Sequence, residues 1–286
     1  MITQTFPFLL PLRVAQRKFF FYAGMRLDGH TYAKTMQDAL LPCEVFSADS
    51  GLYNAHTGFD MVYQENKAFN LKLAAKTLHG LLIRPGETFS FWQAARHADR
   101  HTPYKDGLVV KYGRLCTANG GGLCQMTNLL YWLFLHSPLD IVERHTHRSL
   151  DFPTMRGAAP EGVDATVSEG WLDLKAKNGT DATFQIGIGF DGESITGSLF
   201  ADRAMPRAYE IEGRDLRYVR KNSVVYQTVS IFRREIDRDT REALSESLLY
   251  TNANAIGYPL PGGSFVEEKG YPLLADRNAP LVWHNQ

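Results

Sequence analysis

The 286-residue sequence is poor in cysteine and has no excess of either charge. Its three cysteines are an odd, low number, which argues against a disulfide framework and fits a reducing compartment. Lysine plus arginine and aspartate plus glutamate each count 31, so the formal net charge is zero. Nucleic-acid-binding proteins usually carry a basic excess. We therefore expect no nucleic-acid partner.

Long apolar runs are missing as well. The first 24 residues, MITQTFPFLLPLRVAQRKFFFYAG, hold two short apolar clusters, and the basic residues follow the first cluster. A secretory signal has the opposite order, and a membrane-spanning helix needs about 20 apolar residues. We expect a cytoplasmic protein with no transmembrane segment, whose N-terminal segment packs on the core. The alternative is a basic and aromatic surface that associates peripherally with a membrane.

One strongly apolar helix pattern is present, and strand patterns follow it. Residues 123–135 leave almost no polar face, which predicts a helix buried on most sides. Alternation over residues 139–152 predicts a strand with His145 and His147 on one face. Asn-Gly and Asp-Gly turns divide residues 162–200 into a β-meander. The predicted fold class is α+β, with a buried central helix packed on an antiparallel meander.

Three regions are expected within one globule. Residues 1–65 form an N-terminal segment packed on the core, residues 66–200 form the core domain, and residues 201–286 form a C-terminal β extension with an irregular tail. The sequence SVVYQTVSIFRREID predicts a strand that ends in a turn at DRDT, after a basic connector.

A thiol stands where a glycine run meets the buried helix. Cys124 directly follows GGGL and begins the polar end of the apolar stretch. The partial positive charge of a helix N-terminus lowers the pKa of a thiol, and glycine amides can hold an oxyanion. The predicted order of a helix cysteine, a strand histidine and a strand aspartate is that of transglutaminase-like and papain-like thiol enzymes.

Two other interpretations of these residues stay open. Cys124 could be a core residue and the glycines a tight turn. Alternatively, Cys116, Cys124, His145 and His147 could bind zinc, although their spacing matches no standard finger. We expect Cys43 and Cys116 to be structural, and we expect no metal and no cofactor.

Several blocks resemble the VanW family. They are P-G-E-x-F-S-F at Pro85–Phe91, G-G-G-x-C-Q at Gly120–Gln125, E-R-x-x-H at Glu143–His147 and D-A-T at Asp164–Thr166. The resemblance covers roughly residues 66 to 180. It implies a link to glycopeptide (vancomycin) resistance and to cell-wall peptide metabolism. It also favours His147 over His145, because the family pattern has its histidine at that place.

Two functions are compatible with this pattern. The first is a cysteine-dependent amidase or transpeptidase acting on a peptidoglycan-type peptide or precursor, with Cys124 as nucleophile, His147 as base and Asp164 orienting His147. The second is a non-catalytic binding or scaffolding protein for a wall precursor or a resistance-cluster partner, in which Arg144 captures a carboxylate. The residues expected to contact substrate or its oxyanion are Gly120, Gly121, Gly122, Gln125, Arg144 and Ser90.

Overall fold

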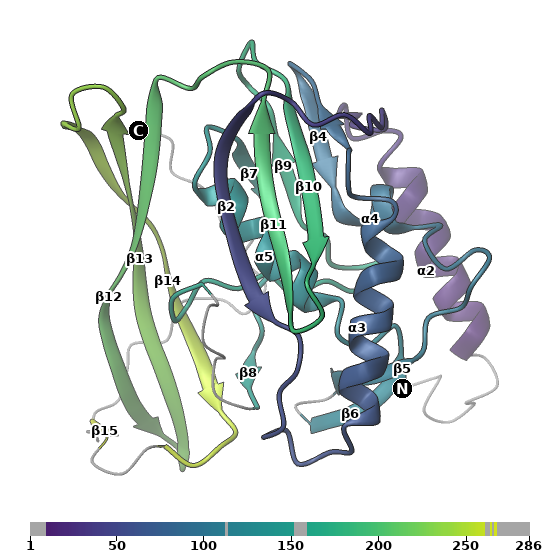
Figure 1. Ribbon diagram of the computed structural model, residues 1–286. Coiled ribbons are helices and arrows are strands. Elements are labelled where there is room, and N and C mark those ends of the chain that lie inside the picture. Colours follow the sequence, from purple (N-terminus) through teal and green to yellow (C-terminus); the bar gives the residue numbers. More distant parts are fainter. Residues whose placement is uncertain (1–9, 112–113, 152–158, 261–263, 265, 268–286) are drawn as a thin grey trace.

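The computed structural model describes residues 10–111, 114–151, 159–260, 264 and 266–267 (Figure 1). The helices are α2 (Leu10–Gly24), α3 (Val62–Ala75), α4 (Phe91–Ala95) and α5 (Cys124–Leu135). The strands of the N-terminal half are β1 (Thr31–Tyr32), β2 (Cys43–Gly51), β3 (Leu82–Ile83), β4 (Glu87–Ser90), β5 (Asp106–Lys111) and β6 (Arg114–Asn119). The later strands are β7 (Asp140–Glu143), β8 (Ser149–Leu150), β9 (Lys175–Lys177), β10 (Phe184–Phe190), β11 (Ser194–Ala201), β12 (Arg207–Lys221), β13 (Val224–Asp237), β14 (Ala243–Ile256) and β15 (Val266–Glu267). The predicted α+β class is confirmed.

The strands form four sheets, and most of their pairings are antiparallel. Two four-stranded sheets, β1-β4-β9-β7 and β2-β11-β10-β3, make up the body together with the β5-β6 hairpin. The five-stranded sheet β15-β12-β13-β14-β8 stands beside the body as a long twisted ribbon (Figure 1). Within the described residues, no helix is long and apolar enough to cross a membrane.

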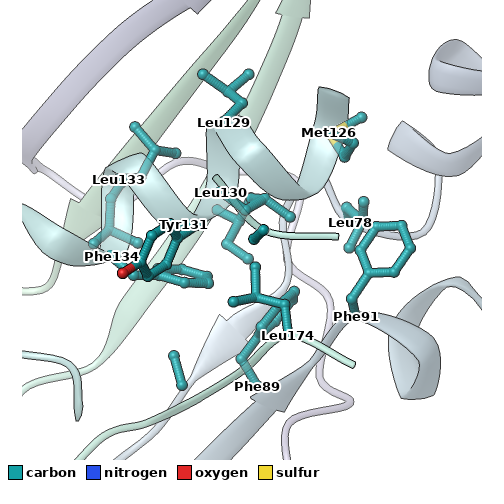
Figure 2. Packing of buried hydrophobic residues seen from close by; sticks show 14 of the residues in the cluster. Leu78, Phe89, Phe91, Met126, Leu129, Leu130, Tyr131, Leu133, Phe134 and Leu174 are labelled. Atoms are coloured by element: carbon teal, nitrogen blue, oxygen red, sulfur yellow. The ribbon is translucent and has the colours of Figure 1, made fainter. Parts of the chain in front are cut away.

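Helix α5 is the centre of the core, as its all-apolar sequence predicts. Leu129 and Leu133 are buried and lie directly over Gly197 of β11, where a Cβ atom would come within 3.0 Å of each side chain. Trp132 is half-buried and packs edge-on against Phe46. Figure 2 shows the aromatic and leucine side chains gathered around this helix. Each fully buried leucine contributes about 1.5–3 kcal/mol to folding, so α5 holds the body together.

The predicted strand through the two histidines is wrong beyond its first residues. Strand β7 ends at Glu143, opposite Lys175, the first residue of its antiparallel partner β9, so His145 and His147 lie in the following loop. Asp164 lies in a loop as well, between β8 and β9. Without a neighbouring strand to pair with, these segments use side-chain hydrogen bonds in place of a ladder.

Only the last part of the predicted β-meander forms two consecutive paired strands. Strands β10 and β11 form a hairpin around Asp191–Gly192, with Gly192 at a φ of 102°. The Asn178–Gly179 segment is not a hairpin turn, because Asn178 donates its side-chain amide to the carbonyls of Ile83 and Ala182 and the chain passes from one sheet to another. The expected basic connector is strand β12, and β14 extends into the region expected to be irregular.

Candidate functional site

The thiol, the histidine and the aspartate predicted from the sequence come together in the structure. Cys124 is the first residue of α5, half-buried, with its sulfur 3.5 Å from the hydroxyl of Thr166. His147 is hydrogen-bonded to the Cys124 thiol, and its Nδ1 lies 2.7 Å from Oδ2 of Asp164. Because Asp164 holds Nδ1, Nε2 is the ring nitrogen left for the sulfur. Three residues from three segments therefore form one hydrogen-bonded series.

The thiol and imidazole shift each other toward their charged forms. Burial raises the pKa of Cys124, but the hydrogen bond and charge of His147, together with bonds from Thr166 and from the Val167 amide, outweigh it and lower the pKa to about 7. Burial lowers the pKa of His147, and its bonds to Asp164 and Cys124 raise it to about 10. These opposite shifts favour the thiolate and imidazolium form of the pair.

Asp164 is held by Arg144, the residue that the sequence analysis assigns to substrate binding. The Arg144 side chain is nearly fully buried, and its Nη2 lies 2.7 Å from Oδ1 of Asp164. Its Nε donates to the Asp164 carbonyl, also at 2.7 Å. The guanidinium stacks on the rings of Tyr131 and Tyr250. With these contacts and both faces of its guanidinium occupied inside the protein, Arg144 positions Asp164.

Two residues of the site were missed in the sequence analysis, and both lie on β14. Asn252 donates its amide to the carbonyl of Gly162 at 2.6 Å and to Oδ1 of Asp164 at 3.2 Å. Asn254 donates its amide to the carbonyl of His147. The alternation of asparagine in TNANAI, which places both side chains on one face of a strand, is the sequence signal that could have found them.

The glycine run does not supply the predicted oxyanion donors at its first two positions. The amides of Gly120 and Gly121 donate to the carbonyls of Lys105 and Ala118. Gly121 also lies so close to Gly107 that an added Cβ would be 2.2 Å from its carbonyl carbon. The N-cap residue, Leu123, has no side-chain cap, and the amides of Gln125 and Met126 in the first turn of α5 donate to the carbonyls of Gly122 and Leu123.

Gln125 and Ser90, which are also predicted to contact substrate, make internal contacts in the structure. Gln125 donates its amide to Ser50 Oγ at 2.9 Å and to the Gly51 carbonyl at 2.7 Å, which ties α5 to β2. Ser90 is buried; its hydroxyl caps α4 by accepting from the Gln93 amide and donates to Asp173 at 2.5 Å. Both residues support the fold around the site.

No observation favours the zinc alternative. His145 pairs with Glu143 through a 3.0 Å contact, while His147 is engaged by Asp164. Across the described ranges, no three histidine, cysteine or acidic side chains are grouped as metal ligands. Cys43, Cys116 and Cys124 are all free thiols.

Comparison with known proteins identifies the family of this chain. The model of the family described as VanW like protein matches residues 66–200. The vancomycin B-type resistance protein VanW of Enterococcus faecalis (strain ATCC 700802 / V583) is 54% identical over 267 residues, which cover 93% of this chain and 97% of that protein. The chain belongs to the VanW family. The uncharacterized protein YoaR of Bacillus subtilis (strain 168) is 34% identical over 115 residues, 40% of this chain and 36% of its own.

The region shared across the VanW family contains only part of the site. Cys124, His147 and Asp164 fall inside residues 66–200, whereas Asn252 and Asn254 lie beyond them. No solved structure matches the chain. The predicted transglutaminase-like order of a helix cysteine, a strand histidine and a strand aspartate is not confirmed, because His147 and Asp164 lie in loops.

Proposed function

We propose that this protein is a cysteine-dependent acyl-transfer enzyme, an amidase or a transpeptidase acting on a peptidoglycan-type peptide or its precursor. The observation that carries the proposal is the hydrogen-bonded series Cys124–His147–Asp164, which has a nucleophile, a base and an orienting carboxylate in reach of one another. The side chain of His147 is 23% exposed, so a substrate can reach the pair. The substrate class is inferred from the vancomycin-resistance relative.

The reaction would begin from the thiolate–imidazolium pair. The Cys124 sulfur adds to the acyl carbon, and the amide at the start of α5 donates to the oxygen that becomes negative. The His147 imidazolium then gives its proton to the departing amine, which leaves an acyl thioester on Cys124. Neutral His147 next takes a proton from water in an amidase, or from an acceptor amine in a transpeptidase. The attack of that nucleophile releases the thiolate.

The contacts around Asp164 fix the orientation of its carboxylate toward His147. Arg144 and Asn252 bind Oδ1 of Asp164, which leaves Oδ2 for the ring of His147. The carboxylate therefore cannot rotate away from the imidazole without breaking contacts with both residues. A base oriented in this way is the usual support of an activated thiol.

One observation favours the alternative, a non-catalytic binding or scaffolding protein. A cavity of about 650 Å³ lies at the far end of α5 from the thiol, beside Trp132 and His136. A protein that only holds a wall precursor or a resistance-cluster partner would need no substrate cavity around Cys124.

Alkylation of the thiol tests the proposed enzyme first. Iodoacetamide labelling of Cys124 would be followed by peptide mass spectrometry from pH 5 to 9, with Cys43 and Cys116 as internal controls. The native thiol should react well below pH 8, because its pKa is lowered to about 7. In His147→Ala the apparent pKa should move to about 8.5 or above, the value of a free thiol. Labelling of Cys124 no faster than the two controls, and unchanged in His147→Ala, would overturn the proposal.

Turnover separates the enzyme from the binding protein. The purified protein would be incubated with wall stem peptides and intact precursors, and the mass of Cys124 peptides and of released products would be measured. An acyl adduct on Cys124 that is absent in Cys124→Ser supports acyl transfer. Binding of the same peptides that Cys124→Ser retains, with no product from either protein, supports the binding alternative.

A further inference from the structure

Helix α2 docks on the body through one side only (Figure 1). Phe21 and Tyr22 pack against the hydrophobic core, and the Tyr22 hydroxyl donates to Glu169 at 3.0 Å. Lys18 forms an ion pair with the same carboxylate. Gly170 lies so near the backbone of Lys18 that an added Cβ would be 3.2 Å away. The docked side is thus held by both apolar and charged contacts.

The other side of α2 presents large apolar side chains to solvent. Leu12 and Phe19 are each 68% exposed and Phe20 is 62% exposed. Successive helix residues are rotated by about 100°, which places these three on the side opposite Lys18 and Phe21. Trp171, 60% exposed, comes from the segment on which α2 docks. Monomeric soluble proteins rarely gather exposed apolar residues of this size without a binding role.

The charges of α2 are all of one sign. The helix contains Arg13, Arg17 and Lys18 and no acidic residue, and Arg26 follows it. Lys18 is paired with Glu169, and Arg17 contacts the carbonyl of that residue. A basic and aromatic face of this kind is typical of helices that lie in the headgroup region of a membrane. The charge therefore identifies an anionic surface as the complement of the apolar residues.

We propose that α2 binds the surface of an anionic lipid bilayer. Leu12, Phe19 and Phe20 would enter the boundary between headgroups and acyl chains, and Arg13 and Arg26 would lie against lipid phosphates. This inference needs no catalytic activity and stands apart from the proposed function.

Membrane binding through α2 would also bring the thiol site to the bilayer. Glu169, which anchors α2, belongs to the same segment as Thr166 and Val167, and these two residues contact the sulfur of Cys124. A lipid-linked wall precursor would then meet the thiol at the membrane surface, a consequence that rests on the proposed function.

Vesicle sedimentation tests the inference. The full chain would be mixed with vesicles of phosphatidylglycerol and phosphatidylcholine, or of phosphatidylcholine alone, and the pelleted fraction measured at low and high salt. We expect binding to the anionic vesicles that salt weakens. The double variant F19S/F20S should lose at least about tenfold in affinity, since interfacial binding scales with buried apolar area. R13E/R26E should lose the preference for anionic lipid.

A matched control uses exposed apolar residues elsewhere. Leu244 and Leu248 on β14 are 49% and 54% exposed, and L244S/L248S should leave vesicle binding unchanged. Binding that is equal for both lipid compositions, or absent, would overturn the proposal. So would an analytical ultracentrifugation result in which F19S/F20S only converts a dimer to a monomer, because the face would then be covered by a second copy. Cys124 alkylation in the same variants should stay at the native rate, which keeps this test separate from that of the thiol chemistry.

Discussion

Asn252 donates its side-chain amide to Oδ1 of Asp164 at 3.2 Å, although the two residues are 88 positions apart in the sequence. The same amide donates to the Gly162 carbonyl, and Asn254 on the same strand holds the His147 carbonyl. The thiol and its helix belong to the body, but the carboxylate and the histidine are fastened by β14. The C-terminal sheet is therefore part of the site.

Removing the Asn252 amide should loosen the histidine without removing any member of the series. In Asn252→Ala we expect the alkylation profile of Cys124 to move to higher pH, because a less fixed Asp164 orients His147 less well. The loss of a donor to buried acceptors should also lower the free energy of unfolding by about 1–3 kcal/mol. Thr251→Ala is the control, since Thr251 bonds Ser230 on the opposite face of the strand. Identical alkylation profiles for both variants would contradict a positioning role for Asn252.

Arg144 should contribute to the stability of the fold as well as to the geometry of the candidate site. Arg144→Met removes the buried ion pair of Arg144 with Asp164 and leaves His147 as the charged partner, and breaking a buried pair costs about 3–5 kcal/mol. Urea unfolding followed by fluorescence measures the change. Arg148→Met, at an exposed position four residues on, should shift the unfolding free energy by no more than about 0.5 kcal/mol. Equal unfolding midpoints for the two variants would show that the ion pair of Arg144 with Asp164 does not stabilise the fold.

The parts of the fold that depend on local pattern could be predicted from the sequence. The all-apolar stretch of α5 specifies a buried helix by itself, and its polar end correctly located the start of the helix at Cys124. The Asp191–Gly192 hairpin needs only a turn between two alternating segments.

The parts that depend on distant partners could not be predicted. Alternation around His145 and His147 suggested a strand, but β9 is too short to pair beyond Glu143. Arg144 was expected to contact substrate because nothing nearby in sequence shows that Tyr250 and Asn252 enclose it. The amide of Gly120 seemed free because its acceptor, the Lys105 carbonyl, lies 15 residues earlier, just before β5.

A buried carboxyl beside α4 should give the protein a pH-dependent stability in mildly acid solution. Burial raises the pKa of Asp173 to about 6, against the hydrogen bond from Ser90, which lowers it. An unfolded aspartate has a pKa of about 3.9, so the folded state binds the extra proton between these values. The contribution of Asp173 to stability therefore falls as pH rises from about 4 to 6 and is level above that range.

Two variants check the sign of this effect by urea unfolding at pH 4, 5, 6 and 7. Asp173→Asn cannot titrate, so it should gain stability relative to the native protein as the pH rises through that window. Ser90→Ala removes the hydrogen bond that lowers the pKa of Asp173. The fall in stability with rising pH should therefore occur at higher pH in this variant than in the native protein. A constant difference between Asp173→Asn and the native protein at all four pH values would refute the assignment.

The approach of two backbones at Gly107 and Gly121 leads to the last prediction. A Cβ on Gly121 would lie 2.2 Å from the carbonyl carbon of Gly107, and one on Gly107 would lie 2.5 Å from the Gly121 carbonyl oxygen. The Gly121 carbonyl is also held by the buried Asn70 amide at 3.0 Å, so neither segment can move aside. Overpacking of this kind costs about 1–3 kcal/mol, and we expect Gly121→Ala to lose at least that amount. Because the strain is placed three residues before Cys124, alkylation of the thiol should slow as well.

Gly24→Ala is the matched control: nothing lies within 4 Å of its added Cβ, and it should unfold within about 0.5 kcal/mol of the native protein. If Gly121→Ala unfolds at the native urea concentration, the close contact is not what requires glycine before α5.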